Sequence, residues 1–184
     1  MGNSLVSFLV IAGTGRPYLR AALESLVRQN SPAWEAIVVE ACEKPSDTVE
    51  VERQVREVSD ARVHVVTYDG VRGYPPYASR KWNFALRHAQ GDLIAFLDDD
   101  DEKEANWVSA MRGPLDDTPG LDATACNGWT IDRNGARQGT LFGLVSLDYG
   151  TLLRGNFVTT GQILVRRSAL DAVGGFDGEL SCAE

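Results

Sequence analysis

The sequence predicts an α/β fold: a mostly parallel sheet flanked by helices, with an antiparallel portion in the C-terminal half. Two observations predict the parallel part. Four apolar, β-branched runs recur at intervals of about 30 residues, and a helical pattern fills each interval. A third observation predicts the antiparallel part, because the strand-like runs after residue 101 are short and one pair is joined by an Asn-Gly turn. The 184 residues, 43% of them hydrophobic, are enough for one well-filled domain.

The four apolar runs show no alternation of apolar and polar residues, so we expect strands that are buried on both faces. They cover Val6–Ile11, Ala36–Val39, Val63–Thr67 and Leu93–Leu97. Ligands of parallel sheets bind beyond the carboxyl ends of the strands, so functional residues are expected directly after each run.

The first two intervals predict amphipathic helices. Pro17 suits the first turn of the earlier one. Its apolar face is expected to contain Leu19, Ala22, Leu23, Leu26 and Val27. Asp47 is the expected N-cap of the second helix. Its inward residues are expected to be Val51, Val55 and Val58.

The third interval predicts a helix with an apolar stripe, and Gly91 is expected to end it in a left-handed cap. The stripe consists of Ala78, Trp82, Ala85, Leu86 and Ala89.

The C-terminal half is expected to hold a hairpin and further short elements. Leu121–Asp132 and Arg137–Phe142 are the predicted hairpin strands, and the turn Asp132–Gly135 contains an Asn-Gly pair that tolerates positive φ. A short helix, a strand and a second short helix ended by two glycines are expected at Leu147–Leu153, Gln162–Val165 and Ser168–Val173.

Four carboxylates, Asp98–Asp101, follow the fourth apolar run directly. Clustered anions at the end of a buried strand repel one another, and a bound cation removes that cost. Oxygen ligands suit Mg²⁺ or Mn²⁺, ions that normally serve bound phosphates. The run therefore indicates a metal–phosphate site, and the alternative is a solvated acidic loop that starts a helix near Glu104.

Charge and composition exclude several classes of protein. The net charge of −8 and the absence of a basic stripe argue against a nucleic-acid partner. No stretch approaches the roughly 20 apolar residues of a membrane span, and Met1–Ser4 lacks the basic start of a signal peptide. The three scattered cysteines indicate reduced thiols in a cytoplasmic protein. His64 and His88 are expected to be structural.

The first and second strands end in residues that could contact a nucleotide. The first ends in Ala12–Pro17, whose two glycines let backbone approach a ligand. Tyr18 stands where a dinucleotide fingerprint needs its third glycine, and no Walker lysine follows. The second strand ends in Glu40, whose carboxylate can accept a hydrogen bond from a nucleobase. A ligand-free turn and a solvated strand end are the alternatives at these two positions.

The helix before the acidic run carries a polar face with Arg80, Asn83 and Arg87 at positions i, i+3 and i+7, and Lys81 beside them. This face could present cations to a pyrophosphate near the acids, or it could be an ordinary solvated face.

Taken together, these pieces resemble the family-2 inverting glycosyltransferases of GT-A fold, over nearly the whole chain. The resemblance rests on the order of three segments and on Asn83 standing eight residues before Gly91. The segments read EAIVVEACEKPSDT, ASRKWNFALRHAQGDLIAFLDDDDE and VRRSALDAVGGFDGELSCAE.

The resemblance implies roles for individual residues. Asp98 and Asp100 match the Asp-x-Asp motif, in which the first acid contacts ribose and sugar and the second ligates Mn²⁺ or Mg²⁺ under the diphosphate. Glu40 matches the acid that recognises the base, although VEACEK departs from the usual two-acid pattern and Trp82 replaces a common arginine. The residues implied to bind the nucleotide-sugar are Ala12, Gly13, Thr14, Arg16, Glu40, Lys81, Asn83, Asp98 and Asp99.

The family's catalytic base is the aspartate of a Glu-Asp pair, and Glu184 resembles the glutamate of that pair. The aspartate would be the next residue. We therefore expect the chain to be a single glycosyltransferase domain that ends early, with a nucleotide-binding half at 1–101 and an acceptor-side half at 102–184.

The resemblance implies that a sugar moves from a nucleotide-diphospho-sugar, most often a UDP-sugar in this family, to a hydroxyl acceptor in cell-surface polysaccharide or glycan synthesis. Two alternatives stay open: a nucleotide-sugar-binding module without turnover, and a nucleotidyltransferase. The latter class usually carries a Gly-rich loop with a basic signature, whereas Gly13–Pro17 is short and has one arginine.

Overall fold

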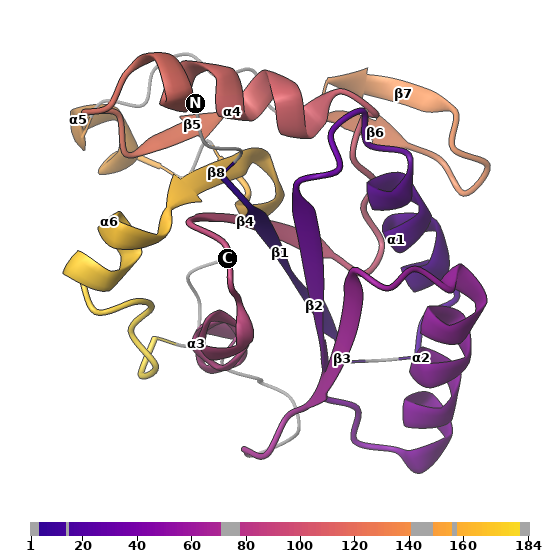
Figure 1. The fold of residues 1–184 in the computed structure, drawn as a ribbon. Coiled ribbons are helices and arrows are strands. Elements are labelled where there is room, and N and C mark those ends of the chain that lie inside the picture. Colours follow the sequence, from indigo (N-terminus) through magenta and orange to yellow (C-terminus); the bar gives the residue numbers. More distant parts are fainter. Residues whose placement is uncertain (1–3, 14, 71–77, 141–148, 156–157, 181–184) are drawn as a thin grey trace.

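The computed structural model describes residues 4–13, 15–70, 78–140, 149–155 and 158–180 (Figure 1). Its N-terminal half alternates strands and helices as predicted: β1 (Val6–Ala12), α1 (Leu19–Val27), β2 (Trp34–Glu40), α2 (Pro45–Val58), β3 (Val63–Thr67), α3 (Ala78–His88) and β4 (Leu93–Asp98). The C-terminal half continues with α4 (Trp107–Asp117), β5 (Ala123–Ala125), β6 (Trp129–Ile131), β7 (Arg137–Thr140), α5 (Tyr149–Leu152), the 3₁₀ helix η1 (Thr160–Gln162), β8 (Ile163–Arg166) and α6 (Arg167–Ala172).

Six strands form the central sheet in the order β3-β2-β1-β4-β8-β5. The first four are parallel, and β8 and β5 join as antiparallel strands. Strands β6 and β7 pair separately as a hairpin. The predicted mixture of a parallel sheet and an antiparallel C-terminal part is therefore confirmed.

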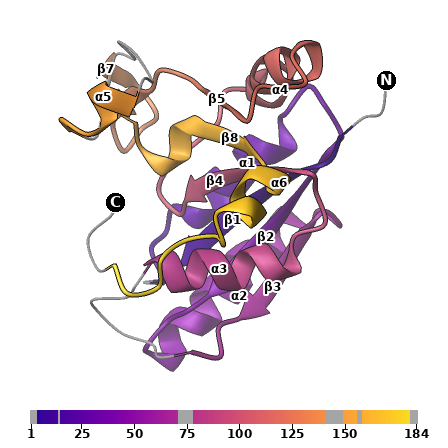
Figure 2. The same cartoon turned by 90° about the vertical axis from the view of Figure 1, so that its left-hand side faces the viewer.

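Helices cover both faces of the sheet (Figure 1). On one face, Phe8 and Val10 of β1 pack in a core with α1, α2 and α4. On the other face, Leu9 packs in a core with α3, which lies in front of the strands in Figure 2. Side chains of a strand alternate between its two faces, so a strand between two helical layers must be apolar throughout.

The register aligns the carboxyl ends of three strands. Ala12 at the end of β1 pairs with Glu40 of β2, and Ile11 pairs with Asp98 of β4. The chain segments that follow β1, β2 and β4 therefore start at one edge of the sheet.

The expectation of burial on both faces is wrong for β3. His64, Val65 and Thr67 are exposed, because β3 is an edge strand. An edge strand has a neighbour on one side only, and an apolar composition alone does not distinguish it from a central strand.

Several predicted boundaries also shift. Pro17 lies before α1, and Lys44 rather than Asp47 is the N-cap of α2, with proline in its first turn. Val27, predicted for the apolar face of the first helix, is 40% exposed. The predicted strand Leu121–Asp132 splits into β5 and β6, which belong to different sheets.

The Gly-Gly stop after α6 is confirmed, because Gly174 and Gly175 both have φ near +80°. The Asn-Gly turn is confirmed as well, with Gly135 at φ +78°.

Gly91 does not have the positive φ that was predicted for it. It is instead required by close packing: a Cβ there would lie 2.5 Å from the carbonyl oxygen of Leu5 and 2.6 Å from Ser7 Oγ. The backbone N–H of Gly91 donates to Ser7 Oγ, and Ser7 in turn donates to the buried carboxylate of Glu35.

Candidate active site

The end of the sheet formed by β1 and β4 opens into a cavity of about 310 Å³. One wall consists of the acids Asp98–Asp100 at the end of β4. Opposite and beside it lie Arg16, Lys81, Trp82, Thr160 and Phe176. Anionic and cationic side chains therefore face one cavity at the place where ligands of parallel sheets bind.

Two of the acids hold protons more tightly than an ordinary aspartate. Burial, together with the charges of Asp101 and Asp100, raises the pKa of Asp98 to about 6. Burial and the charge of Asp100 raise the pKa of Asp99 to about 6. Both shifts mean that the ionised acids lack sufficient positive charge around them, which a bound cation would supply.

The loop after β1 contacts the acids directly. The guanidinium of Arg16 donates to Asp100 at 2.7 Å in a half-exposed ion pair. The backbone N–H of Gly13 interacts with the carboxylate of Asp99 and opposes the rise of its pKa. The predicted glycine-rich turn and the predicted acidic run thus form one site.

Lys81 brings a buried ammonium to the same cavity. A Cβ added to Gly13 would lie 3.9 Å from its Nζ, so the ammonium sits beside the loop after β1. Burial lowers the pKa of Lys81. An anionic ligand in the cavity would offset this cost, because opposite charges favour the ionised form.

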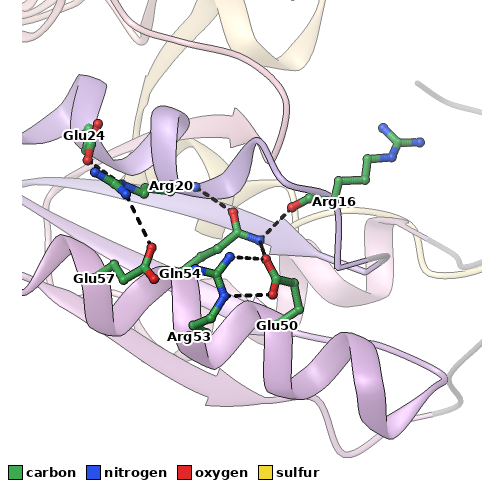
Figure 3. Close-up of polar contacts among 7 residues, drawn as sticks. All are labelled: Arg16, Arg20, Glu24, Glu50, Arg53, Gln54 and Glu57. Atoms are coloured by element: carbon green, nitrogen blue, oxygen red, sulfur yellow. Dashed lines mark hydrogen bonds and ion pairs between the residues drawn. The ribbon is translucent and has the colours of Figure 1, made fainter.

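Gln54 of α2 supports the Arg16 loop, and the sequence reasoning missed it. Its side chain is 1% exposed; its Nε2 donates to the Arg16 carbonyl and its Oε1 accepts from the Arg20 N–H (Figure 3). Figure 3 also shows the Arg16 guanidinium extending away from the helices. A polar residue on the inward face of an amphipathic helix, next to Val51 and Val55, was the available signal.

Replacing Gln54 by leucine is expected to lower the free energy of unfolding by about 1–3 kcal/mol, because two backbone groups lose their partner. Arg53→Leu is the matched control one residue away. Arg53 forms half-exposed ion pairs with Glu50 and Glu57, so we expect Arg53→Leu to lower the free energy of unfolding much less than Gln54→Leu does. Urea denaturation followed by circular dichroism measures both, and equal losses would contradict the bridging role of Gln54.

Lys103 fixes the chain directly after the acids Asp98–Asp101, and the sequence reasoning did not identify it. Its ammonium donates to the Gly161 carbonyl and lies 4.7 Å from the Trp107 ring centroid. Burial lowers its pKa to about 8, and the charges of Asp101 and Asp98 oppose that shift. Lys103 therefore connects the acids to η1, whose Thr160 lines the cavity.

Glu40 lies at the predicted strand end, but its side chain points into the protein. Its Oε1 accepts hydrogen bonds from the Cys42 N–H and the Thr48 hydroxyl, and the residue is 1% exposed. In this arrangement it shapes the loop after β2. Ala12 is buried as well, and its carbonyl accepts a hydrogen bond from the Ala41 N–H.

The predicted cationic face of α3 holds the C-terminal segment instead of facing the acids. Asn83 donates to the Phe176 carbonyl at 2.7 Å and accepts from the Phe176 N–H at 2.9 Å. Arg80 donates to the Gly178 carbonyl and pairs with Glu179. A Cβ on Gly175 would lie 2.7 Å from the Asn83 oxygen. Asn83 thus positions Phe176, which is a wall of the cavity, and its predicted nucleotide contact stays a prediction.

Other predicted residues have simpler outcomes. Thr14 and Glu184 lie outside the described residues. His64 and His88 are exposed. Neither Cys42 nor Cys126 forms a disulfide within the described residues. Among the described helices, none is both long and apolar enough to cross a bilayer.

A metal ion would need ligands beyond the protein at this site. Within the described residues, no three Asp, Glu, His or Cys side chains are gathered closely enough to hold an ion by themselves. The donor set nevertheless fits Mg²⁺ or Mn²⁺, since such ions use one or two carboxylates together with the phosphates of a substrate. The raised pKa of Asp98 comes from burial and from the neighbouring negative charges, and a bound divalent ion would oppose both effects.

Comparison with known proteins extends this picture. The model of the family "Glycosyl transferase family 2" matches residues 7–174. TuaG of Bacillus subtilis (strain 168), named for teichuronic acid biosynthesis, is 35% identical over 98 residues, which are 53% of this chain and 36% of TuaG. WfgD of Escherichia coli, named a UDP-Glc:alpha-D-GlcNAc-diphosphoundecaprenol beta-1,3-glucosyltransferase, is 32% identical over 106 residues, or 58% of this chain and 39% of WfgD.

Two solved structures share the fold. The mannosyltransferase PcManGT of Pyrobaculum calidifontis, in complex with GDP-Man and Mn²⁺, superposes with a TM-score of 0.69 at 19% identity, covering 96% of this chain and 48% of that one. S. aureus TarS 1-349 with UDP-GlcNAc superposes with a TM-score of 0.72 at 20% identity, covering 98% and 50%. The chain thus spans about half of these structures and less than half of the curated relatives.

Proposed function

Because the chain belongs to glycosyltransferase family 2, we propose that its cavity binds a nucleotide-diphospho-sugar with a divalent ion for transfer of the sugar to a hydroxyl acceptor. One observation carries this proposal: a single cavity at the carboxyl ends of β1 and β4 is lined by the acids Asp98–Asp100 and by the cations Arg16 and Lys81. The carboxylates can ligate the divalent ion, and the two cationic side chains can bind the negatively charged diphosphate.

Each charged residue has a part in donor binding. Asp98 and Asp100 would hold Mn²⁺ or Mg²⁺, which when bound supplies a Lewis acid that stabilises charge on the leaving diphosphate. Lys81, buried beside the loop after β1, binds a phosphate oxygen as a point charge. The ion pair of Arg16 with Asp100 is half exposed and weak, so the Arg16 guanidinium can leave Asp100 and bind the diphosphate instead.

The acceptor hydroxyl attacks the anomeric carbon on the face opposite the leaving diphosphate, so the configuration inverts. A carboxylate takes its proton, a contribution of roughly 10²–10⁴-fold in general. Asp98 and Asp99 orient the sugar, and orientation lowers the barrier further. TuaG is named for teichuronic acid biosynthesis, and WfgD is named for transfer of glucose to a GlcNAc-diphosphoundecaprenol. These names support our proposal that this chain acts in the synthesis of cell-surface polysaccharides.

Calorimetry with UDP, with and without Mn²⁺, tests the proposal. We expect Mn²⁺ to strengthen UDP binding at pH 7.5 by about tenfold or more, and GDP and dTDP to bind more weakly than UDP. The gain should shrink at pH 5, because Asp98 and Asp99, whose pKa is about 6, are then largely protonated and have lost the negative charge that attracts the cation. Equal UDP affinity with and without Mn²⁺ at pH 7.5 would overturn the metal role.

A further inference from the structure

A second cavity, of about 380 Å³, lies next to the first and is lined by the following residues of the acidic loop. Its walls are Asp101–Glu104 together with Trp129 and Arg137 of the β6–β7 hairpin. The hairpin stands apart from the central sheet in Figure 1. The two cavities share their dividing wall, because Asp98–Asp100 and Thr160 line the first while Asp101 and Gly161 line the second.

Trp129 presents an aromatic surface to this second cavity. Its side chain is 51% exposed, whereas Trp34, Trp82 and Trp107 are at most 6% exposed. The Arg137 guanidinium lies 5.2 Å from the centroid of the Trp129 ring and is itself paired with Glu104. An indole fixed in this way offers a rigid apolar platform with polar groups around it, which suits the C–H face and the hydroxyl edge of a pyranose.

The charges around the second cavity balance. Three acids, Asp101, Glu102 and Glu104, face three cations, Arg28, Lys103 and Arg137. Arg28 pairs with Glu102 at 2.8 Å, and Arg137 pairs with Glu104. Lys103 attracts Asp101. A phosphate or a nucleotide would need an excess of positive charge, so these walls favour a neutral ligand whose hydroxyls can both donate and accept.

Hydrogen bonds from Lys103 and Gln162 fix the wall of the second cavity. Lys103 is buried and donates to the Gly161 carbonyl, and its backbone N–H donates to Ser25 Oγ at 3.0 Å. The Gln162 side chain donates to the Cys126 carbonyl. A binding site whose lining residues are held by such hydrogen bonds keeps its shape when no ligand is bound.

We propose that the second cavity binds a neutral pyranose unit of the acceptor, at a distance from the hydroxyl that attacks the donor. This inference rests on the proposed function, which places the donor in the first cavity. Trp129 lines the second cavity and not the first, so the sugar unit held against it is a different unit from the one that presents the attacking hydroxyl. The acceptor is therefore an oligosaccharide that passes over the loop, and a monosaccharide fills only part of the site.

The test uses the chain labelled with 5-fluorotryptophan, which gives four fluorine signals, one for each tryptophan. Cellobiose, maltose and N,N′-diacetylchitobiose are titrated separately to about 50 mM, since single-sugar contacts are expected to be weak, with millimolar dissociation constants. The signal that disappears in Trp129→Phe is assigned to Trp129. We expect that signal to shift saturably with at least one disaccharide while the signals of the buried Trp34 and Trp82 stay in place.

Variants then locate the site by calorimetry with the same disaccharide. Trp129→Ala is expected to weaken binding by about fivefold or more, and Trp129→Phe, which keeps an aromatic ring, by about threefold or less. Tyr18→Ala is the matched control, because Tyr18 is a 44% exposed aromatic that does not line this cavity. All variants should bind UDP with Mn²⁺ like the parent chain.

The outcomes separate the two proposals. A missing response of the Trp129 signal to all three disaccharides, or unchanged disaccharide affinity in Trp129→Ala, overturns this inference even if UDP binds. Loss of UDP binding in the parent chain overturns the proposed function instead.

Discussion

Asp100→Ala is expected to abolish the Mn²⁺ dependence of UDP binding while the chain remains folded. Asp100 lies two residues after the end of β4 and lines the cavity, and its carboxylate is the one that the Asp-x-Asp resemblance assigns to the ion. Among the described residues, its carboxylate pairs with Arg16, and because this ion pair is half exposed, its loss changes the free energy of unfolding by at most about 1 kcal/mol. Calorimetry should show UDP affinity in Mn²⁺ falling by about tenfold or more, the scale on which supporting groups of metal sites act.

Two controls separate the metal role from the ion pair. Arg16→Gln removes the same pair but keeps the carboxylate, and it should retain the Mn²⁺ dependence. Asp116→Ala removes a surface carboxylate of α4, paired with Arg112 at 3.0 Å, and should change neither UDP affinity nor its dependence on Mn²⁺. A full Mn²⁺ dependence in Asp100→Ala would reject the assignment of Asp100.

Gly91→Ala is expected to lower the free energy of unfolding by about 1–3 kcal/mol, the usual cost of forcing an extra carbon into a packed interior. The added Cβ would meet the backbone oxygen of Leu5 at 2.5 Å and the backbone nitrogen of Ser7 at 2.9 Å. Neither atom can move without disturbing β1 at the centre of the sheet. Urea denaturation gives the free energy directly.

Gly120→Ala is the matched control for this substitution. A Cβ on Gly120 would meet no atom within 4 Å, and its φ is not positive. The change should therefore be neutral or stabilise the chain by about 0.4–1 kcal/mol, through the smaller conformational entropy of the unfolded state. Similar losses of unfolding free energy in both variants would show that the atoms around Gly91 can move to accept the added carbon, which would contradict the role of close packing there.

Most of the strands and helices could be predicted from the sequence, because each of them follows from a pattern of neighbouring residues. The four apolar runs and the helical stripes between them correspond to β1–β4 and α1–α3. What could not be predicted depends on neighbours far away in the chain. The exposure of β3 follows from its position at the sheet edge, and the separation of β5 from β6 follows from which strand each one meets.

The site divides in the same way. Asp98–Asp100, Gly13, Arg16 and Lys81 were recognised because strand ends, acids and glycines are visible in the sequence, and the structure brings them together around one cavity. Gln54 and Lys103 were missed because each acts through hydrogen bonds to backbone groups of distant segments. The pairing of Asn83 with Phe176 spans 93 residues, and no local pattern reports it.

By itself, the sequence determined the alternation of strands and helices, the position of the acidic run at a strand end and the resemblance to a glycosyltransferase family, since all of these depend on residue type and short spacing. Only the tertiary structure decided which charges meet. It placed Arg16 against Asp100, turned Glu40 inward and set Trp129 at the rim of a second cavity. The physical reason is that hydrogen bonds, ion pairs and burial are set by distance in space, whereas local patterns carry only distance along the chain.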